Sequence, residues 1–322
     1  MGASHTTLRL DIPRRWHVRT AVLVALVLSL AVPLRSVTQS APTTERPDIL
    51  VTTGVLGAVV RDLVGDAATV SVLMGDGVDP HEWSPSAQDI ETLHHADLVI
   101  ANGAHLEAAI DEVLDEVAAS GVTVFRAMDH VAVRGTDDGL EGAEDPTASH
   151  DREDGPVDPH FWTDPLSMRD VVSALVPVLT GLGVDTAQQG RDLMGRLTDL
   201  DAEVRAILAV VPAERRKLVT GHESMGYFAA RYGFQLVGAI IPGLSSQGEV
   251  SASQLAAIAA LIREQAVPAI FTEVGTSQAV VDAIAGETGV QVVPLPSHAL
   301  PADGSYLTFI RDIATAIAGA LA

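Results

Sequence analysis

Short β-rich runs separated by longer amphipathic runs repeat along most of this chain, and no other feature constrains its fold as strongly. In the first series, residues 48–53, 68–73 and 98–102 have strand patterns. Residues 54–64 and 86–95, which lie between these runs, have the apolar spacing of helices. Strands regularly separated by helices favour parallel sheets covered by helices. The first half of the chain is therefore predicted to form an α/β lobe.

A second series of the same kind follows residue 213. Its strand patterns are at 217–220, 235–240, 269–272 and 290–294, and its helical patterns are at 225–232, 253–265, 277–288 and 306–320. A chain of 322 residues is long enough to bury a core in each of two lobes. The fold class that we expect is α/β, with two parallel-sheet lobes.

The two series are separated by the longest uninterrupted helical pattern in the chain, at residues 187–211. Its apolar residues recur at three- and four-residue spacing on one face: Leu193, Met194, Leu197, Leu200, Val204, Ile207, Leu208 and Val211. At about 1.5 Å per residue, this helix is roughly 35 Å long and is predicted to join the lobes as a stiff connector. The domains expected are an N-terminal lobe at 41–185, a connecting helix at 186–212 and a C-terminal lobe at 213–322.

Residues 1–40 have the order of an export signal. Arg14, Arg15 and Arg19 precede an apolar run at 20–34, and small residues follow that run. The run of about 15 residues is short for a membrane-spanning helix. We expect the signal to place the rest of the chain in the periplasm or at the extracellular face of the cytoplasmic membrane. Cleavage of the signal and its retention as an anchor both remain open.

The charge and the cysteine content exclude several classes of protein. Acidic residues outnumber basic residues by 42 to 20, and the resulting net charge of -22 argues against nucleic acid as a partner. The chain has no cysteine, so disulfides, thiolate ligands and a lipid-modified cysteine are excluded, and we expect that the protein is not a lipoprotein. Any metal must be held by His, Asp or Glu.

The segment 134–158 is rich in acidic residues, glycine and proline and poor in apolar residues. This composition predicts a mobile acidic loop. Two roles are open for it. It is either a solvated insertion, or its carboxylates and His150 collect metal ions near a site.

Four of the eleven histidines follow strand or loop ends and are flanked by turn-forming residues. Two of them lie in near-copies of one motif, DPHEW around His81 and DPHFW around His160. Because proline fixes φ and favours an extended residue before it, the imidazole that follows leaves a stiff backbone. His222 and His298 follow two strands of the second series, and strand ends are where open α/β sheets bind ligands. The four histidines together predict a metal centre.

With these motifs the chain resembles the metal-binding substrate-binding proteins of bacterial zinc and manganese ABC importers. The resemblance runs from about residue 48 to residue 322 and rests on DPHEWSPSAQD at 79–89, ANGAHLE at 101–107, DPHFWTDP at 158–165, VTGHESMGYFAARYGF at 219–234 and the segment 243–273. It implies a receptor that captures Zn²⁺ and delivers it to the membrane permease of an ABC transporter, without enzymatic chemistry. We expect this receptor to be a monomer.

The resemblance places His81, His160 and His222 on three of the family's four ligand positions, with the metal between the lobes. The fourth position is normally an Asp in a segment like L-x-x-D-S-L. The corresponding stretch of this chain reads LPSHAL, so His298 stands where the acid is expected. Either His298 binds the metal directly, or the site uses three histidines with water or with a carboxylate such as Glu273.

The type of ligand bears on the metal and on the competing functions. Nitrogen-rich tetrahedral sites favour Zn²⁺, whereas Mn²⁺ suits sites with carboxylate oxygens, so zinc is expected and a manganese receptor is the alternative. A zinc hydrolase with Glu82 or Glu273 as general base is less favoured, because the chain has neither H-E-x-x-H nor G-x-S-x-G. Glu82, Glu223 and Glu273 are also candidates for orienting the imidazoles.

Overall fold

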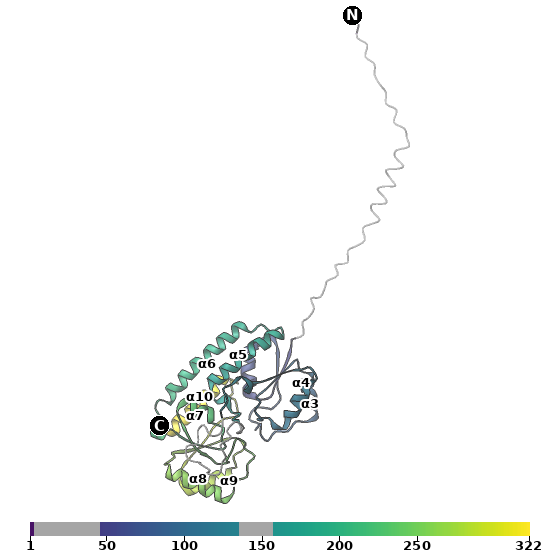
Figure 1. Cartoon of the computed structure of the whole chain (residues 1–322). Coiled ribbons are helices and arrows are strands. Elements are labelled where there is room, and N and C mark those ends of the chain that lie inside the picture. The colour runs from purple at the N-terminus through teal and green to yellow at the C-terminus, as the bar shows by residue number, and fades with distance from the viewer. Residues whose placement is uncertain (3–45, 135–156) are drawn as a thin grey trace. The chain divides into compact units, whose positions relative to one another are not determined.

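The computed structural model describes residues 1–2, 46–134 and 157–322. Within it, Arg46–Ala322 forms one compact unit (Figure 1). The predicted export signal at 1–40, apart from residues 1–2, and nearly all of the predicted acidic loop at 134–158 lie outside the described residues.

The N-terminal lobe is built on a parallel sheet with the strand order β2-β1-β3-β4. Its strands are β1 Asp48–Val51, β2 Thr69–Val72, β3 Leu98–Ala101 and β4 Thr123–Arg126, and its helices are α2 Gly54–Val64, α3 Ala87–His95 and α4 Asp111–Ala119. The central strand β3 is apolar and buried throughout, as expected for a strand covered on both faces. Edge strand β2 instead alternates exposed and partly buried residues.

The C-terminal lobe contains two parallel strand pairs. β5 Lys217–Thr220 pairs with β6 Gln235–Ala239, and β7 Ala269–Thr272 pairs with β8 Gln291–Pro294. β5 also lies next to β7. The helices of this lobe are α7 Gly226–Tyr232, α8 Ala252–Glu264, α9 Gln278–Thr288 and α10 Tyr306–Leu321. The predicted α/β class with parallel strands is thus confirmed.

Local sequence signals account for many of the helix ends. Thr53 accepts a hydrogen bond from the first turn of α2, and Ser86 and Ser251 form capping boxes at the starts of α3 and α8. Gly233 and Gly289 end α7 and α9 with φ angles of 71° and 70°. This left-handed conformation suits glycine because it has no Cβ.

Two long helices lie between the two series of strands in the chain, α5 Pro165–Gly181 and α6 Ala187–Leu208 (Figure 1). Helix α6 packs against α5 and α2 on the N-terminal side and against α10 of the C-terminal lobe. One continuous hydrophobic core includes Val51 of β1, Leu197 of α6, Phe271 of β7 and Ile313 of α10. The helix lies where the connector was predicted, and its stiffness remains a prediction.

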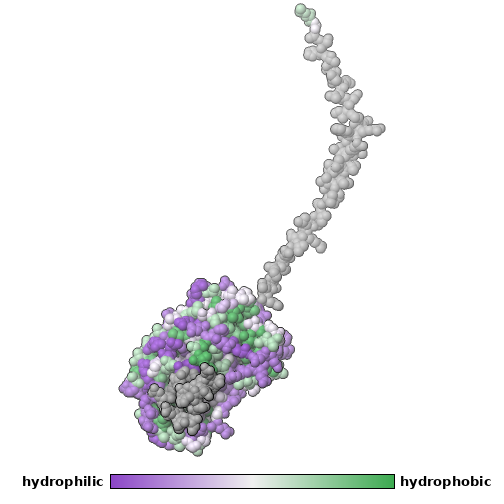
Figure 2. All heavy atoms as spheres, in the orientation of Figure 1, coloured by the Kyte–Doolittle hydropathy of each residue, from purple (hydrophilic) through white to green (hydrophobic). Residues whose placement is uncertain are grey.

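On the face in Figure 2, hydrophilic residues surround smaller hydrophobic areas. The exposed large hydrophobic residues in this part of the chain are Met1, Val78, Val133 and Val210. Among the described helices, none has the length and apolar character needed to cross a membrane.

Candidate metal centre

Three of the four predicted histidines bring ring nitrogens to one point between the lobes. The Nε2 atom of His160 lies 3.2 Å from Nε2 of His81 and 3.2 Å from Nε2 of His222. Within the described residues, these three form a group of metal-ligating side chains whose ligand atoms all lie within 4.8 Å of one another. Ligand nitrogens about 3.3 Å apart are expected around a tetrahedral zinc with bonds of about 2.0 Å. The spacing therefore fits such an ion.

The repeated Asp-Pro-His motif folds in the same way at its two positions. Asp79 Oδ1 accepts the backbone N–H of His81 at 3.0 Å, and Asp158 Oδ1 accepts the backbone N–H of His160 at 2.9 Å. A carboxylate that bonds the backbone two residues on closes a tight turn. Since proline also stiffens each motif, both imidazoles leave the backbone from a fixed position.

Buried carboxylates orient two of the imidazoles. His160 Nδ1 lies 2.8 Å from Asp158 Oδ1. Glu273 Oε2 accepts the backbone N–H of His222 at 3.3 Å and lies 3.0 Å from its Nδ1, a close contact without hydrogen-bond geometry. A carboxylate on Nδ1 fixes the tautomer and turns Nε2 toward a metal. Ser224 Oγ donates to Glu273 Oε1, so both oxygens of Glu273 are engaged. These contacts favour Glu273 as an orienting group rather than a ligand.

The electrostatics of the site shift the pKa values of the three imidazoles in different directions. Burial, together with the neighbouring imidazoles, lowers the pKa of His81 to about 3 and that of His160 well below its usual value. Burial alone would lower the pKa of His222 as well, but the Glu273 carboxylate outweighs it and raises that pKa. Burial opposes ionisation of Glu273, yet His222 and Ser224 lower its pKa to about 2. The contact between His222 and Glu273 thus favours the protonated imidazole and the ionised carboxylate.

His298 lies beside the three convergent imidazoles without joining their group. Its ring stacks on that of His222 with centroids 6.0 Å apart and lies 5.6 Å from the Trp162 ring. Its Nδ1 lies 2.9 Å from Ser297 Oγ, while its Nε2 is buried and has no hydrogen-bond partner among the described residues. A buried unpaired nitrogen is costly, so an ion or a small ring movement that engages Nε2 would stabilise the site.

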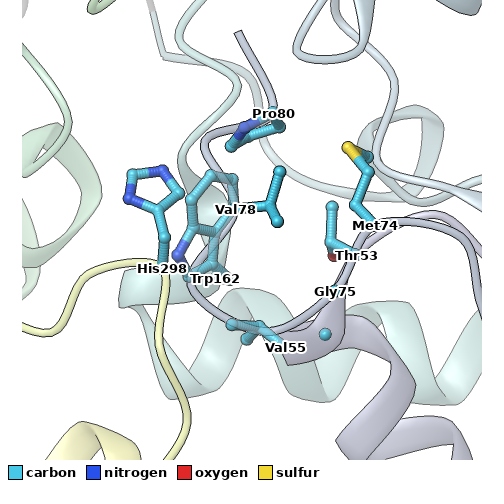
Figure 3. Close-up of a pocket in the computed structure, with 9 residues that line it drawn as sticks. Thr53, Val55, Met74, Gly75, Val78, Pro80, Trp162 and His298 are labelled. Carbon is cyan, nitrogen blue, oxygen red and sulfur yellow. The ribbon is translucent and has the colours of Figure 1, made fainter. Parts of the chain in front are cut away.

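A small pocket adjoins His298 (Figure 3). It is lined by Thr53, Gly54, Val55, Met74, Gly75, Val78, Pro80, Trp162 and His298. Figure 3 shows His298 beside Trp162 on one side, with Met74 and Thr53 on the other. The Trp162 indole donates to the carbonyl of Ser297 at 3.1 Å, so this large ring forms a fixed wall beside the histidines.

The other two glutamates predicted near the site, Glu223 and Glu82, lie in different environments. Glu223 accepts the backbone N–H of Gly243 at 3.2 Å, and Glu82 is exposed. The orienting role of Asp158 was not predicted from the sequence. The sequence feature that could have indicated this role is the aspartate two residues before the histidine in both copies of the motif.

The fold and the histidine cluster together define a two-lobed α/β binding protein with a site between the lobes. Residues 49–320 match the family described as zinc-uptake complex component A, periplasmic. The chain belongs to this family.

Three relatives illustrate the range of the family. The chain is similar to the zinc-binding protein TroA of Treponema pallidum, with 34% identity over 232 residues that cover 71% of this chain and 70% of TroA. A solved structure of TroA matches with a TM-score of 0.73 and 29% identity, covering 86% of this chain and 99% of that one.

The other two relatives are more distant. The zinc-binding lipoprotein AdcA of Streptococcus pneumoniae is 27% identical over 239 residues, which cover 72% of this chain but only 46% of AdcA. The manganese-binding lipoprotein MntA of Halalkalibacterium halodurans is 25% identical over 248 residues, which cover 76% of each chain. Zinc and manganese are thus both named among the relatives.

Proposed function

We propose that this protein is an extracytoplasmic solute-binding protein that captures Zn²⁺ and delivers it to the membrane permease of an ABC transporter. The observation that carries this proposal is the convergence of three imidazole Nε2 atoms between the lobes. The relatives TroA and AdcA, both named as zinc-binding, support the same metal.

The proposed ligands are His81, His160, His222 and His298. The first three present Nε2 to one point, and the buried unpaired Nε2 of His298 is the nearest candidate for the fourth position. Four nitrogens suit zinc better than manganese, which prefers carboxylate oxygens. A manganese receptor remains the alternative.

Zinc binding would require the loss of the proton on one imidazole, that of His222. His81 and His160 are neutral before zinc arrives, so their Nε2 lone pairs are available. His222 must lose its Nε2 proton, while Glu273 retains the Nδ1 contact and so keeps the ring in place. Trp162 and the buried surroundings of His160 limit access of water to the bound ion.

We propose that the protein binds zinc for transport and does not catalyse a reaction. A hydrolase would need a carboxylate free to act as a base beside an open metal position. Both oxygens of Glu273 are engaged, and Glu82 is exposed. We also propose that the protein is a monomer, that residues 1–40 direct its export, and that it is not a lipoprotein, since it has no cysteine.

Metal content and competitive titration of residues 41–322 test the proposal. We expect one tightly bound zinc per chain, and binding of manganese that is weaker by at least an order of magnitude. Preference for manganese would overturn the zinc assignment. Hydrolysis of ester or phosphate substrates that depends on the bound metal would overturn the receptor assignment.

A further inference from the structure

The motif ANGAHLE at 101–107 contains a buried carboxylate that the metal centre does not use. Glu107 is 1% exposed and lies where the two central strands of the N-terminal sheet end. Its Oε1 accepts the Thr52 hydroxyl at 2.5 Å and the Asn102 backbone N–H at 2.7 Å. Its Oε2 accepts the Gly103 N–H at 3.2 Å. The carboxylate therefore ties the end of β1 to the turn that follows β3.

That turn has an uncommon backbone. Gly103, Ala104 and His105 have φ angles of 85°, 51° and 60°. Ala and His seldom adopt positive φ, and such conformations persist only where the surroundings hold them. The bonds from Glu107 to the two backbone N–H groups before the strained pair supply this restraint.

The restrained turn places the side chain of Asn102 against the segment that carries His160. The Asn102 amide donates to the carbonyl of Pro159 at 2.9 Å, in a fully buried contact 57 residues away in sequence. Pro159 directly precedes His160. The N–H of His160 is held by Asp158, and its carbonyl accepts the Thr163 hydroxyl at 3.0 Å. Among these contacts, the Asn102 bond is the one that joins the His160 segment to the sheet.

We propose that Asn102, restrained by Glu107, is a positioning residue that sets the place of His160 in the metal centre. This inference rests on the proposed function, in which His160 binds zinc. It connects the buried carboxylate and the strained turn to the metal centre. Because ligand atoms must be placed to within about 0.5 Å, loss of this bond changes the geometry at the metal.

The test compares Asn102→Ala with Ser167→Ala in the full chain. Ser167 is a control for the loss of a buried hydrogen bond in the same region, since its hydroxyl donates to Asp164 at 2.9 Å and makes no bond to Pro159 or His160. Zinc affinity is measured by competitive titration. The stability of the metal-free protein is measured by urea unfolding, and the coordination geometry is followed by the visible absorption spectrum of the Co²⁺ form.

We expect Asn102→Ala to weaken zinc binding about 10- to 100-fold and to change the Co²⁺ spectrum. Ser167→Ala should lower stability while leaving both the affinity and the spectrum unchanged. If Asn102→Ala does not fold, Asn102→Ser replaces it, because the serine hydroxyl keeps a polar group in the buried site but is too short to reach Pro159. The backbone N–H that donates to Glu107 is present in both variants.

Wild-type affinity together with a wild-type Co²⁺ spectrum in the folded Asn102 variant would overturn the positioning role. An equal loss of affinity in Ser167→Ala would also overturn it, since the effect would then be one of general stability. Failure of the wild-type protein to bind zinc would instead refute the proposed function, so the two ideas fail separately.

Discussion

Among the three convergent imidazoles, that of His222 alone has a raised pKa, because the Glu273 carboxylate lies 3.0 Å from its Nδ1. Below that raised pKa, zinc must displace one proton from His222. His81, with a pKa of about 3, and His160 remain neutral at the same pH. Proton competition near neutral pH therefore comes from one histidine rather than three.

The pH dependence of zinc affinity tests this charge distribution. Between about pH 5 and pH 6.5, we expect the logarithm of the dissociation constant to rise by about one for each unit that the pH falls. Above the raised pKa of His222 it should become constant. Competitive titrations across this range measure the slope, and a slope approaching three would mean that all three histidines titrate near their usual pKa.

Substitution of Glu273 separates its charge from its shape. Glu273→Gln keeps the size of the side chain but removes the charge that raises the pKa of His222. We expect zinc affinity at pH 8 to fall about 10- to 100-fold, because the ring is less well oriented. The pH at which the slope appears should also move downward. Glu223→Gln is the control, and an unchanged Glu273→Gln titration would contradict the orienting role.

Removal of His298 tests the fourth ligand. Its unpaired buried Nε2 predicts that His298→Ala weakens zinc binding by about 2 kcal/mol, roughly 30-fold. The exposed His94→Ala variant on α3 should bind normally. Competitive titration of both variants measures the zinc affinity. Unchanged affinity in His298→Ala would indicate three histidine ligands and an exchangeable fourth position.

At the scale of loops and elements, segments from opposite lobes are bonded around the histidines. The Gln247 amide donates to the carbonyl of His81. Asp76 accepts the N–H of Leu300 at 2.7 Å, and the N–H of Gly77 donates to the carbonyl of His298 at 3.1 Å. His81 is thus held partly from the other lobe, whereas His160 is held within its own.

This difference predicts that Gln247 slows metal release. Loss of one hydrogen bond worth about 1 kcal/mol should raise the zinc dissociation rate about fivefold in Gln247→Ala. The association rate should change little, because the bond engages the backbone carbonyl of His81 and leaves its ligand nitrogen free. Stopped-flow transfer of zinc to a chelator measures both rates. Gln188→Ala on the exposed face of α6 is the control, and equal dissociation rates would exclude the role.

Most helices and strands, but not all, could be predicted from sequence patterns. Apolar spacing predicted most strands and helices, and the structure adds the caps Ser86 and Ser251 at two helix starts. Helix α5, helix α4 and strand β4 were not predicted. Helix α5 contains Pro177, which lacks the N–H that an interior turn normally uses. Its burial against α6 outweighs this local cost.

The candidate site was only partly accessible to the same reasoning. Turn chemistry singled out the four histidines, because proline and glycine leave local signals. The separation of His298 Nε2 from the other nitrogens, and the bond from Asn102 to Pro159, depend on packing between distant segments. Sequence spacing contains no measure of such distances.

At the scale of the whole molecule, the two lobes share a hydrophobic core that includes Val51 and Phe271. Helix α6 packs on α2 at one side and α10 at the other. Opening a wide cleft between the lobes would expose part of this core to water, at about 25 cal/mol for each Å² of apolar surface. The lobes should therefore move little when zinc binds.

Distance measurements between spin labels test this prediction, and the absence of native cysteine makes the labelling specific. Gln88→Cys on α3 and Glu264→Cys on α8 place labels at exposed positions in opposite lobes. We expect the mean distance to change by less than about 2 Å on addition of zinc. A pair within the N-terminal lobe, Gln88→Cys with Asp115→Cys, is the control. A large closure between the lobes would mean that α6 bends and that the shared core opens during each transport cycle.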